Sequence, residues 1–312
     1  MFMRKKIMIA VDQSIHSRNA MAYAARMAET LKEIDFALFH IQPMISQYLV
    51  EEAVRNPRSK AELHRIYEKN RQASHLLLEN CKAHLQSKGI DVNCIEIKTQ
   101  PRQHGIAEDI LTAAEVGSYD AVLVGRRGIS GLQEMFMGSV TSNLLAGSQV
   151  IPVWVVDGRV SSDDVLVAVD GSAQSLRSVD HVAYIFSRIS TARLQFLNIE
   201  PRLDDFCEME ASPGDTSALE EAMQASNKKY ISDFSAKAME ILKKAEILPD
   251  QVSFATLKKQ FFTGKAIIET AKKQGFGTVV IGKSGMGNNR HLGKVASYVI
   301  QKMSDAAVWM VS

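Results

Sequence analysis

Short apolar runs alternate with longer segments of helical periodicity along the first half of the chain. The apolar runs lie near 6–12, 35–42, 92–98, 120–125 and 150–156. They are nearly continuous rather than alternating, which is typical of strands covered on both faces. The helical patterns between them lie near 14–32, 59–88, 104–116 and 138–147. This alternation predicts an α/β fold with a parallel sheet and helices on both of its faces.

The second half of the chain repeats the pattern of the first half. The segment IMIAVDQS at 7–14 corresponds to VLVAVDGS at 165–172, an offset of 158. The pairs FALFHIQP and LQFLNIEP, then DAVLVGRRG and GTVVIGKSG, follow in the same order with offsets of 158 and 157. Because the repeat is a whole domain long, it indicates a tandem duplication rather than a solenoid of small units. We expect domains at 1–157 and 163–312, joined through the polar, turn-rich segment 157–164.

Several residues predict local details of these elements. Ser14 suits the N-cap of the first helix, and Gly89 suits the end of the second helix. His40 lies within a predicted strand, which favours a packed or hydrogen-bonded imidazole. The least regular segments, 44–60 and 202–217, follow the second strand of each copy, and we expect both to be loops. Loops at this place border the carboxyl ends of the strands, where ligands bind in open parallel sheets.

A glycine-rich segment, GRRGISGLQEMFMGS at 125–139, follows the fourth predicted strand directly. Its glycines let the backbone approach a phosphate closely. Gly138 and Ser139 open a helix whose unpaired N–H groups and dipole favour negative charge, and the serine hydroxyl can add a hydrogen bond. Arg126 and Arg127 can neutralise phosphate charge or point to solvent. The alternative is that the glycines only make turns and begin the helix.

The spacing of this segment, G-2x-G-9x-G-S after the fourth strand, resembles the ATP-binding motif of the universal stress protein (UspA) family. The strand ends AVDQS and AVDGS are similar to that family's usual end of strand one. The resemblance covers nearly the whole chain, in two copies. It implies that each copy is a doubly wound, Rossmann-like α/β/α sandwich around a five-stranded parallel sheet, of the adenine nucleotide alpha hydrolase-like type. It also implies that the ligand is ATP, ADP or AMP and that the role is nucleotide-linked stress regulation, not catalysis.

The same resemblance assigns roles to residues of the first copy. Asp12, after Ala10 and Val11 at the end of strand one, matches the acidic residue near the ribose and adenine. Ile41 matches the backbone position that reads the adenine edge. The positions that match the phosphate and ribose contacts are Gly125, Arg127, Gly128, Gly138, Ser139, Val140 and Thr141.

The second copy departs from this pattern. Seven residues rather than nine separate Gly285 from Gly293, and Lys294 stands where the serine would be. Lys294 could contact a phosphate or fill the space with its side chain. Two interpretations stay open, a second nucleotide site and a degenerate copy kept for packing against its twin. The corresponding positions are Asp170, Ile199, Gly282, Gly285, Gly293 and Lys294.

Sequence signatures of catalysis are absent from the chain. The segment GTVVIGKS at 277–284 formally matches a P-loop, but its four middle residues are predicted to form a strand. HExxH, GxSxG, HIGH-type and SGGxDS-type sequences do not occur. We therefore expect no enzyme, with slow ATP hydrolysis left open and a nucleotide-independent interaction scaffold as the alternative. Mg²⁺ beside the phosphates is chemically reasonable, although the sequence shows no dedicated carboxylate cage.

Composition and charge exclude other classes of protein. The 312 residues include 37 Lys and Arg against 35 Asp and Glu, without a basic arm for nucleic acid. Basic residues at 59–88 are interleaved with glutamates, which indicates a solvated face. No apolar run reaches the roughly 18 residues of a membrane helix. The start of the chain does not read as a signal peptide, so we expect a cytoplasmic protein. Three cysteines without CxxC spacing argue against a zinc site and a disulfide framework.

The last predicted strand of each copy, 150–156 and 306–311, is apolar and lies at a sheet edge. Exposed strand edges invite pairing with another strand. In the resembled family, single domains dimerise through this strand. We therefore expect the two halves to pair within one chain, and further association into a homodimer stays open.

Overall fold

The protein is described here by a computed structural model that covers residues 4–31, 33–127, 137–189, 191–200, 213–258, 262–284 and 292–312. Contacts divide the chain into two units, Met1–Val156 and Asp157–Ser312. We refer to them as domain 1 and domain 2 and describe each by itself.

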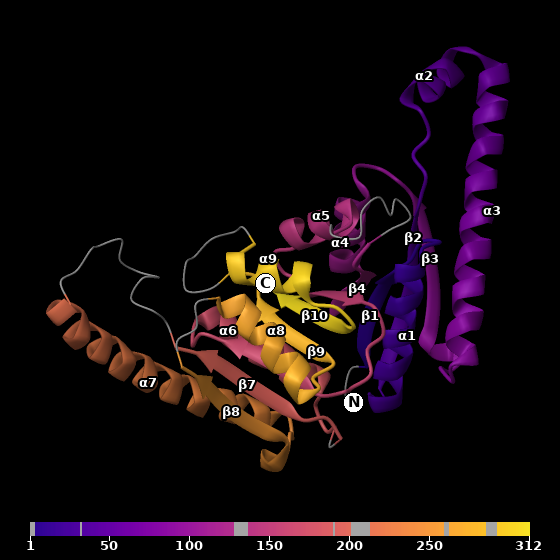
Figure 1. Ribbon diagram of the computed structural model, residues 1–312. Helices are drawn as coiled ribbons and strands as arrows, with labels where there is room; N and C mark the ends of the chain where they lie inside the picture. The colour runs from indigo at the N-terminus through magenta and orange to yellow at the C-terminus, as the bar shows by residue number, and fades with distance from the viewer. Residues whose placement is uncertain are drawn as a thin grey trace. The chain divides into compact units, whose positions relative to one another are not determined.

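A parallel sheet forms the centre of domain 1 (Figure 1). Its strands are β1 (Lys5–Ala10), β2 (Ile34–Gln42), β3 (Ile95–Pro101), β4 (Ala121–Gly125) and β5 (Val153–Asp157). Parallel pairings give the spatial order β3-β2-β1-β4-β5. From β1 the chain first adds β2 and β3 on one side. It then crosses back and adds β4 and β5 on the other side of β1. The carboxyl ends of β1 and β4 border the switch point, where open α/β sheets bind ligands.

Helices cover both faces of this sheet (Figure 1). The order of the strands and right-handed crossovers put α1 and α3 on one face and α4 and α5 on the other. Ile7, Ile9, Leu38 and Leu123 are fully buried between these layers. This confirms the predicted doubly wound α/β architecture. The helices are α1 (Ile15–Thr30), α2 (Gln47–Arg55), α3 (Pro57–Ser87), α4 (Ile106–Val116) and α5 (Ser139–Gly147), with a 3-10 turn, η1 (Val92–Cys94).

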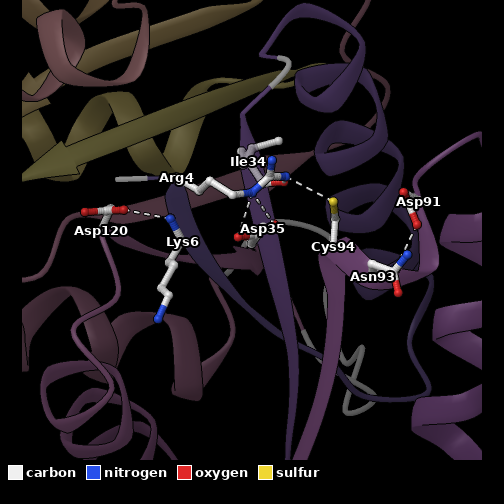
Figure 2. Close-up of polar contacts among 8 residues, drawn as sticks. All are labelled: Arg4, Lys6, Ile34, Asp35, Asp91, Asn93, Cys94 and Asp120. Carbon is white, nitrogen blue, oxygen red and sulfur yellow. Dashed lines mark hydrogen bonds and ion pairs between the residues drawn. The ribbon is translucent and has the colours of Figure 1, made fainter. Parts of the chain in front are cut away.

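Polar contacts tie the amino-terminal ends of the strands together (Figure 2). The Nε of Arg4 donates to both carboxylate oxygens of Asp35, at 2.9 and 3.0 Å, and its Nη2 lies 3.0 Å from the Sγ of Cys94. The backbone N–H of Lys6 donates to Oδ2 of Asp120 over 2.7 Å. These contacts join β1 to β2, η1 and β4 at the end of the sheet opposite the switch point.

Single-residue expectations for domain 1 are confirmed. The hydroxyl of Ser14 accepts the N–H of Ser17 and caps α1. Gly89 follows the end of α3 with a φ of +91°, a conformation that favours glycine. The Nδ1 of His40 lies 2.8 Å from the carbonyl oxygen of Val11.

The expectation of a loop at 44–60 is wrong. This segment contains α2 and the start of α3, which form a hairpin that extends past the sheet (Figure 1). Asn56 accepts the N–H of Arg58 and Pro57 occupies the first turn, so a local helix start is encoded there. Only Ala53 is buried in α2, and the first buried residue of α3 is Ser74. The nine residues of α2 are fewer than the window over which helical periodicity is recognised, so the sequence did not reveal this helix.

The long helix α3 has the solvated charged surface that the sequence predicts. Arg65 pairs with Glu62 at 2.7 Å, and Arg71 pairs with Glu68 at 2.8 Å. All four side chains are exposed, and both pairs have the i,i+3 spacing of helix neighbours. Such exposed pairs add little to stability, and this face of α3 is solvated.

Domain 2 repeats the architecture. Its parallel strands have the order β8-β7-β6-β9-β10, with α6 and α7 on one face and α8 and α9 on the other. The loop expected at 202–217 is wrong from Pro213 on, where α7 begins, and 201–212 lie outside the described residues. The elements are β6 (Val165–Val169), α6 (Ala173–Ile185), β7 (Leu194–Ile199), α7 (Pro213–Lys244), η3 (Pro249–Gln251), β8 (Val252–Leu257), α8 (Thr263–Gln274), β9 (Thr278–Gly282), α9 (Lys294–Lys302) and β10 (Ala306–Val311).

An aromatic contact between the first helix and the last strand occurs in each domain. Tyr23 meets Trp154 edge-on, with ring centroids 6.5 Å apart. In domain 2 the corresponding rings are His181 and Trp309, 5.6 Å apart. Burial lowers the pKa of His181 to about 3. The imidazole is therefore neutral in the folded domain, whereas the unfolded chain takes up a proton below about pH 6.5.

This difference in proton uptake predicts acid sensitivity. As the pH falls from 7 to 5, His181 should cost the folded state about 2 kcal/mol, because only the unfolded state gains the proton. Urea unfolding at both pH values should show a shallower loss of stability for His181→Phe than for the wild type. The control His64→Phe changes an exposed histidine of α3 and should retain the wild-type slope. Equal slopes for all three proteins would contradict the prediction.

Candidate functional site

A cavity of 430 Å³ opens at the carboxyl ends of β1, β2 and β4, and we call it the domain 1 cavity. Its volume lies within the range of small-molecule sites. Every motif position of the first copy that the structure describes lines it, whereas Gly128 lies outside the described residues. The fold thus gathers residues more than 120 positions apart, namely Ala10, Val11, Asp12, Ile41, Gly125, Arg127, Gly138, Ser139, Val140 and Thr141.

The carboxylate of Asp12 is held by the turn that leads into α1. Its Oδ1 accepts the hydroxyl of Ser17 at 2.6 Å and the N–H of Ser14 at 2.9 Å. The hydroxyl oxygen of Ser17 accepts the N–H of Asp12 at 2.8 Å in return. Within the described part of the chain, these side-chain contacts all use Oδ1. The second carboxylate oxygen is therefore available to accept a hydrogen bond from a ligand hydroxyl.

His40 is a cavity residue whose tautomer follows from its partner. Its Nδ1 lies 2.8 Å from the carbonyl oxygen of Val11, which can only accept. The proton is therefore assigned to Nδ1, and a neutral ring leaves Nε2 as an acceptor. The contact also fixes the carboxyl end of β1 against β2.

The amino-terminal end of α5 lines the domain 1 cavity without a side-chain cap. Gly138 begins the helix without a side-chain cap, and its carbonyl accepts the first helical hydrogen bond, from Ser142 at 2.9 Å. The N–H groups of Ser139, Val140 and Thr141 precede that bond and need partners other than the helix. The helix dipole adds partial positive charge at the same place. A phosphate at this end of α5 would meet both requirements.

Gly125 serves close packing rather than a phosphate turn. A Cβ at this position would lie 2.5 Å from the backbone carbon and oxygen of His16 in α1. The absence of a side chain lets α1 pack directly against the end of β4. The carbonyl of Gly125 also accepts the Thr141 hydroxyl at 3.0 Å, which ties α5 to the same strand. The close approach of α1 is therefore enough to explain why a glycine stands at this position of the motif.

The sequence analysis did not assign about half of the cavity lining. The D-x-S-x-x-S pattern of Asp12 could have indicated Ser17, because short hydroxyl side chains stabilise such turns. Arg102, which directly follows β3, carries no motif that would reveal it. The unassigned lining residues are Ser17, Phe39, His40, Gln42, Pro43, Met44, Arg102, Ile106, Ile110 and Val124.

Domain 2 has a corresponding cavity of 540 Å³. Oδ1 of Asp170 accepts the Ser175 hydroxyl at 2.6 Å and the Ser172 N–H at 3.0 Å, which repeats the turn of domain 1. Asn198 replaces His40, and its Nδ2 donates to the carbonyl of Val169 at 3.1 Å. Of the positions predicted for the second copy, Gly285 lies outside the described residues, and the lining includes Asp170, Ile199, Gly282, Gly293 and Lys294.

The two cavities differ in chemistry where α5 and α9 begin. Lys294 and Ala296 replace Ser139 and Thr141, so the first turn of α9 carries neither hydroxyl. Lys283 lines the domain 2 cavity and is only 4% exposed, and burial lowers the pKa of its amine. Domain 2 therefore keeps the carboxylate turn and the helix end, but one hydroxyl is replaced by the amine of Lys294 and the other by the methyl group of Ala296.

Three further features concern a P-loop, a metal site and a membrane-spanning helix. Thr278–Gly282 form β9, so the P-loop-like segment has a strand where a P-loop would wrap a phosphate. Among the described residues, no cluster of three or more His, Cys, Asp or Glu side chains could hold a metal ion. None of the helices described is both long and apolar enough to span a membrane.

The packing around Gly125 predicts a large effect from one methyl group. Gly125→Ala should lower the free energy of unfolding by about 1–3 kcal/mol or more, because the new Cβ would overlap the α1 backbone. Gly105→Ala is the matched control, since a Cβ there would meet nothing within 4 Å. Chemical denaturation of the two variants measures the difference. Equal, small losses in both would show that the end of β4 tolerates a side chain.

The sequence model of the universal stress protein family matches this chain twice, at residues 3–157 and at residues 162–311. The universal stress protein YxiE of Bacillus subtilis (strain 168) is 27% identical over 156 residues, which are 49% of this chain and 99% of YxiE. The crystal structure of a universal stress protein from Archaeoglobus fulgidus DSM 4304 has a TM-score of 0.66 at 17% identity, covering 100% of this chain and 99% of that one. A protein of unknown function from Pseudomonas aeruginosa PAO1 has a TM-score of 0.55 at 14% identity, with 99% and 92% covered. With both halves matched and the fold shared along its whole length, this chain belongs to the universal stress protein family and contains two of its domains in tandem.

Proposed function

We propose that domain 1 binds an adenine nucleotide and that the protein acts as a nucleotide-regulated member of the stress response. The observation that carries the proposal is one cavity that combines an available carboxylate oxygen on Asp12 with the uncapped amino end of α5. Hydroxyl recognition by a carboxylate and phosphate recognition by a helix end are the two polar requirements of a nucleotide.

The remaining walls of the domain 1 cavity suit a purine base. Phe39, Ile41 and Ile110 supply apolar surface on the side of the cavity formed by β2 and α4. The start of α5 and Arg127 line the cavity where β4 ends. An adenine among the apolar side chains would place the ribose near Asp12 and the phosphates at Ser139. Mg²⁺ would accompany the phosphates.

We assign the nucleotide a regulatory role rather than that of a substrate. Pro43 and Met44 line the domain 1 cavity and lead within a few residues into α2. Tyr48 and Val54 of α2 are 72% and 84% exposed, so the hairpin presents apolar side chains to solvent. A ligand that contacts the base of the hairpin can bias its position and thereby a partner's access to it. The alternative, a nucleotide-independent scaffold, would use the same surface without a ligand.

We also propose that the two domains pair within the chain through their last strands, β5 and β10. Both strands are edge strands of their own domain's order, and their sequences VWVV and AAVWMV are apolar. An unpaired apolar edge of this kind is a site of self-association. Pairing inside one chain would cover both edges and leave homodimer formation to other surfaces.

Titration calorimetry with ATP and Mg²⁺ tests the proposed site. Ser139→Ala removes the hydroxyl in the first turn of α5 and should weaken ATP binding by about tenfold, the value of a hydrogen bond to a charged group. Ser142→Ala is the matched control, because this exposed serine of the same helix does not line the cavity. No heat of binding to the wild-type protein would favour the scaffold. Equal affinity of Ser139→Ala and Ser142→Ala for ATP would show that the Ser139 hydroxyl does not contact the nucleotide.

A further inference from the structure

Arg102 lies between β3 and α4 and lines the domain 1 cavity. It also lines a second cavity of 610 Å³ between α4 and α5, which we call the outer cavity. The two cavities share four lining residues, all in or next to the first turns of these helices: Arg102, Ile106, Ser139 and Val140. Arg102 is therefore at the junction of the cavities, beside the helix end proposed to hold phosphate.

One donor of the Arg102 guanidinium has no hydrogen-bond partner within the described part of the chain. Its Nε is buried and makes no hydrogen bond there. Other arginines of domain 1 are paired, for example Arg4 with Asp35 and Arg65 with Glu62. A guanidinium stays charged at all ordinary pH values, and a buried N–H without a partner costs free energy. A bound anion at the junction would satisfy it.

The charges around the outer cavity limit where an anion can sit. Glu108 and Glu115 line the outer cavity, and neither lines the domain 1 cavity. Two carboxylates repel a phosphate that moves far beyond the junction. Arg102 and the first turn of α5 favour a phosphate at the junction itself. The charge pattern therefore defines an end point for a chain of phosphates that begins in the domain 1 cavity.

We propose that Arg102 binds the terminal phosphate of the nucleotide and sets the preference for nucleotides with a longer phosphate chain. The inference rests on the proposed function, because it places the base and ribose in the domain 1 cavity. The planar guanidinium can donate two parallel hydrogen bonds to one phosphate, a geometry that a lysine amine does not match. In the proposed arrangement the phosphates, and not the nucleoside, face Arg102, so the affinity for adenosine should be independent of this residue.

The test is a ladder of ligands, adenosine, AMP, ADP and ATP, titrated against the full-length protein. The wild type should bind ATP most tightly. Arg102→Met should weaken ATP by about tenfold to a hundredfold and leave adenosine unchanged. Arg102→Lys keeps the charge and should fall between the two. Arg65→Met, on the exposed surface of α3, should match the wild type for every ligand. Thermal unfolding of each variant checks that the fold is retained.

The ladder separates the failure of this inference from the failure of the proposed function. If the wild type binds none of the four ligands, the nucleotide site itself is wrong. If it binds ATP and Arg102→Met loses adenosine and ATP equally, Arg102 contacts the base or shapes the cavity. If Arg102→Met binds all four ligands with the affinities of the wild type, Arg102 does not contact a phosphate. The second and third results overturn the inference while leaving the nucleotide site in place.

Discussion

Where β4 ends, α1 approaches Gly125 so closely that no side chain fits, and α5 is hydrogen-bonded to the same residue. Gly125 leaves space for the backbone of His16, and its carbonyl accepts the hydroxyl of Thr141. The first contact fixes α1, which begins with the turn that holds Asp12. The second fixes the uncapped end of α5. Because both elements are attached to one strand end, a carboxylate and an uncapped helix end line one cavity.

The two domains show which parts of this arrangement the duplicated sequence keeps. The carboxylate–serine turn has nearly the same distances in both copies, 2.6 Å from the hydroxyl and 2.9 or 3.0 Å from the N–H. The turn that begins the helix is also shared, since Gly138 bonds Arg126 and Gly293 bonds Lys283 in the same way. The hydroxyls at the helix end are not shared. The framework is thus common to the domains, whereas the donors that would meet a phosphate have diverged.

The elements of the sheet and the assembly of the site were within reach of the sequence. Strands such as Ala121–Gly125 are buried on both faces, so their apolar runs are unambiguous. The helix α2 was missed because its nine residues are fewer than the window over which helical periodicity is recognised, whereas α3 lies close to the helix expected at 59–88. Arg102 was missed because its importance comes from the meeting of two cavities, which no local pattern records.

The proposed regulatory role depends most directly on whether a nucleotide occupies domain 1. The measurement is to denature the purified, untreated protein and identify any released nucleotide by chromatography and mass, with its stoichiometry per chain. The account predicts about one adenine nucleotide per chain, because domain 1 alone combines the carboxylate turn with a hydroxyl-bearing helix end. Two nucleotides per chain would contradict the assignment to domain 1 alone. No nucleotide, together with no binding of added ATP and Mg²⁺, would contradict the central claim.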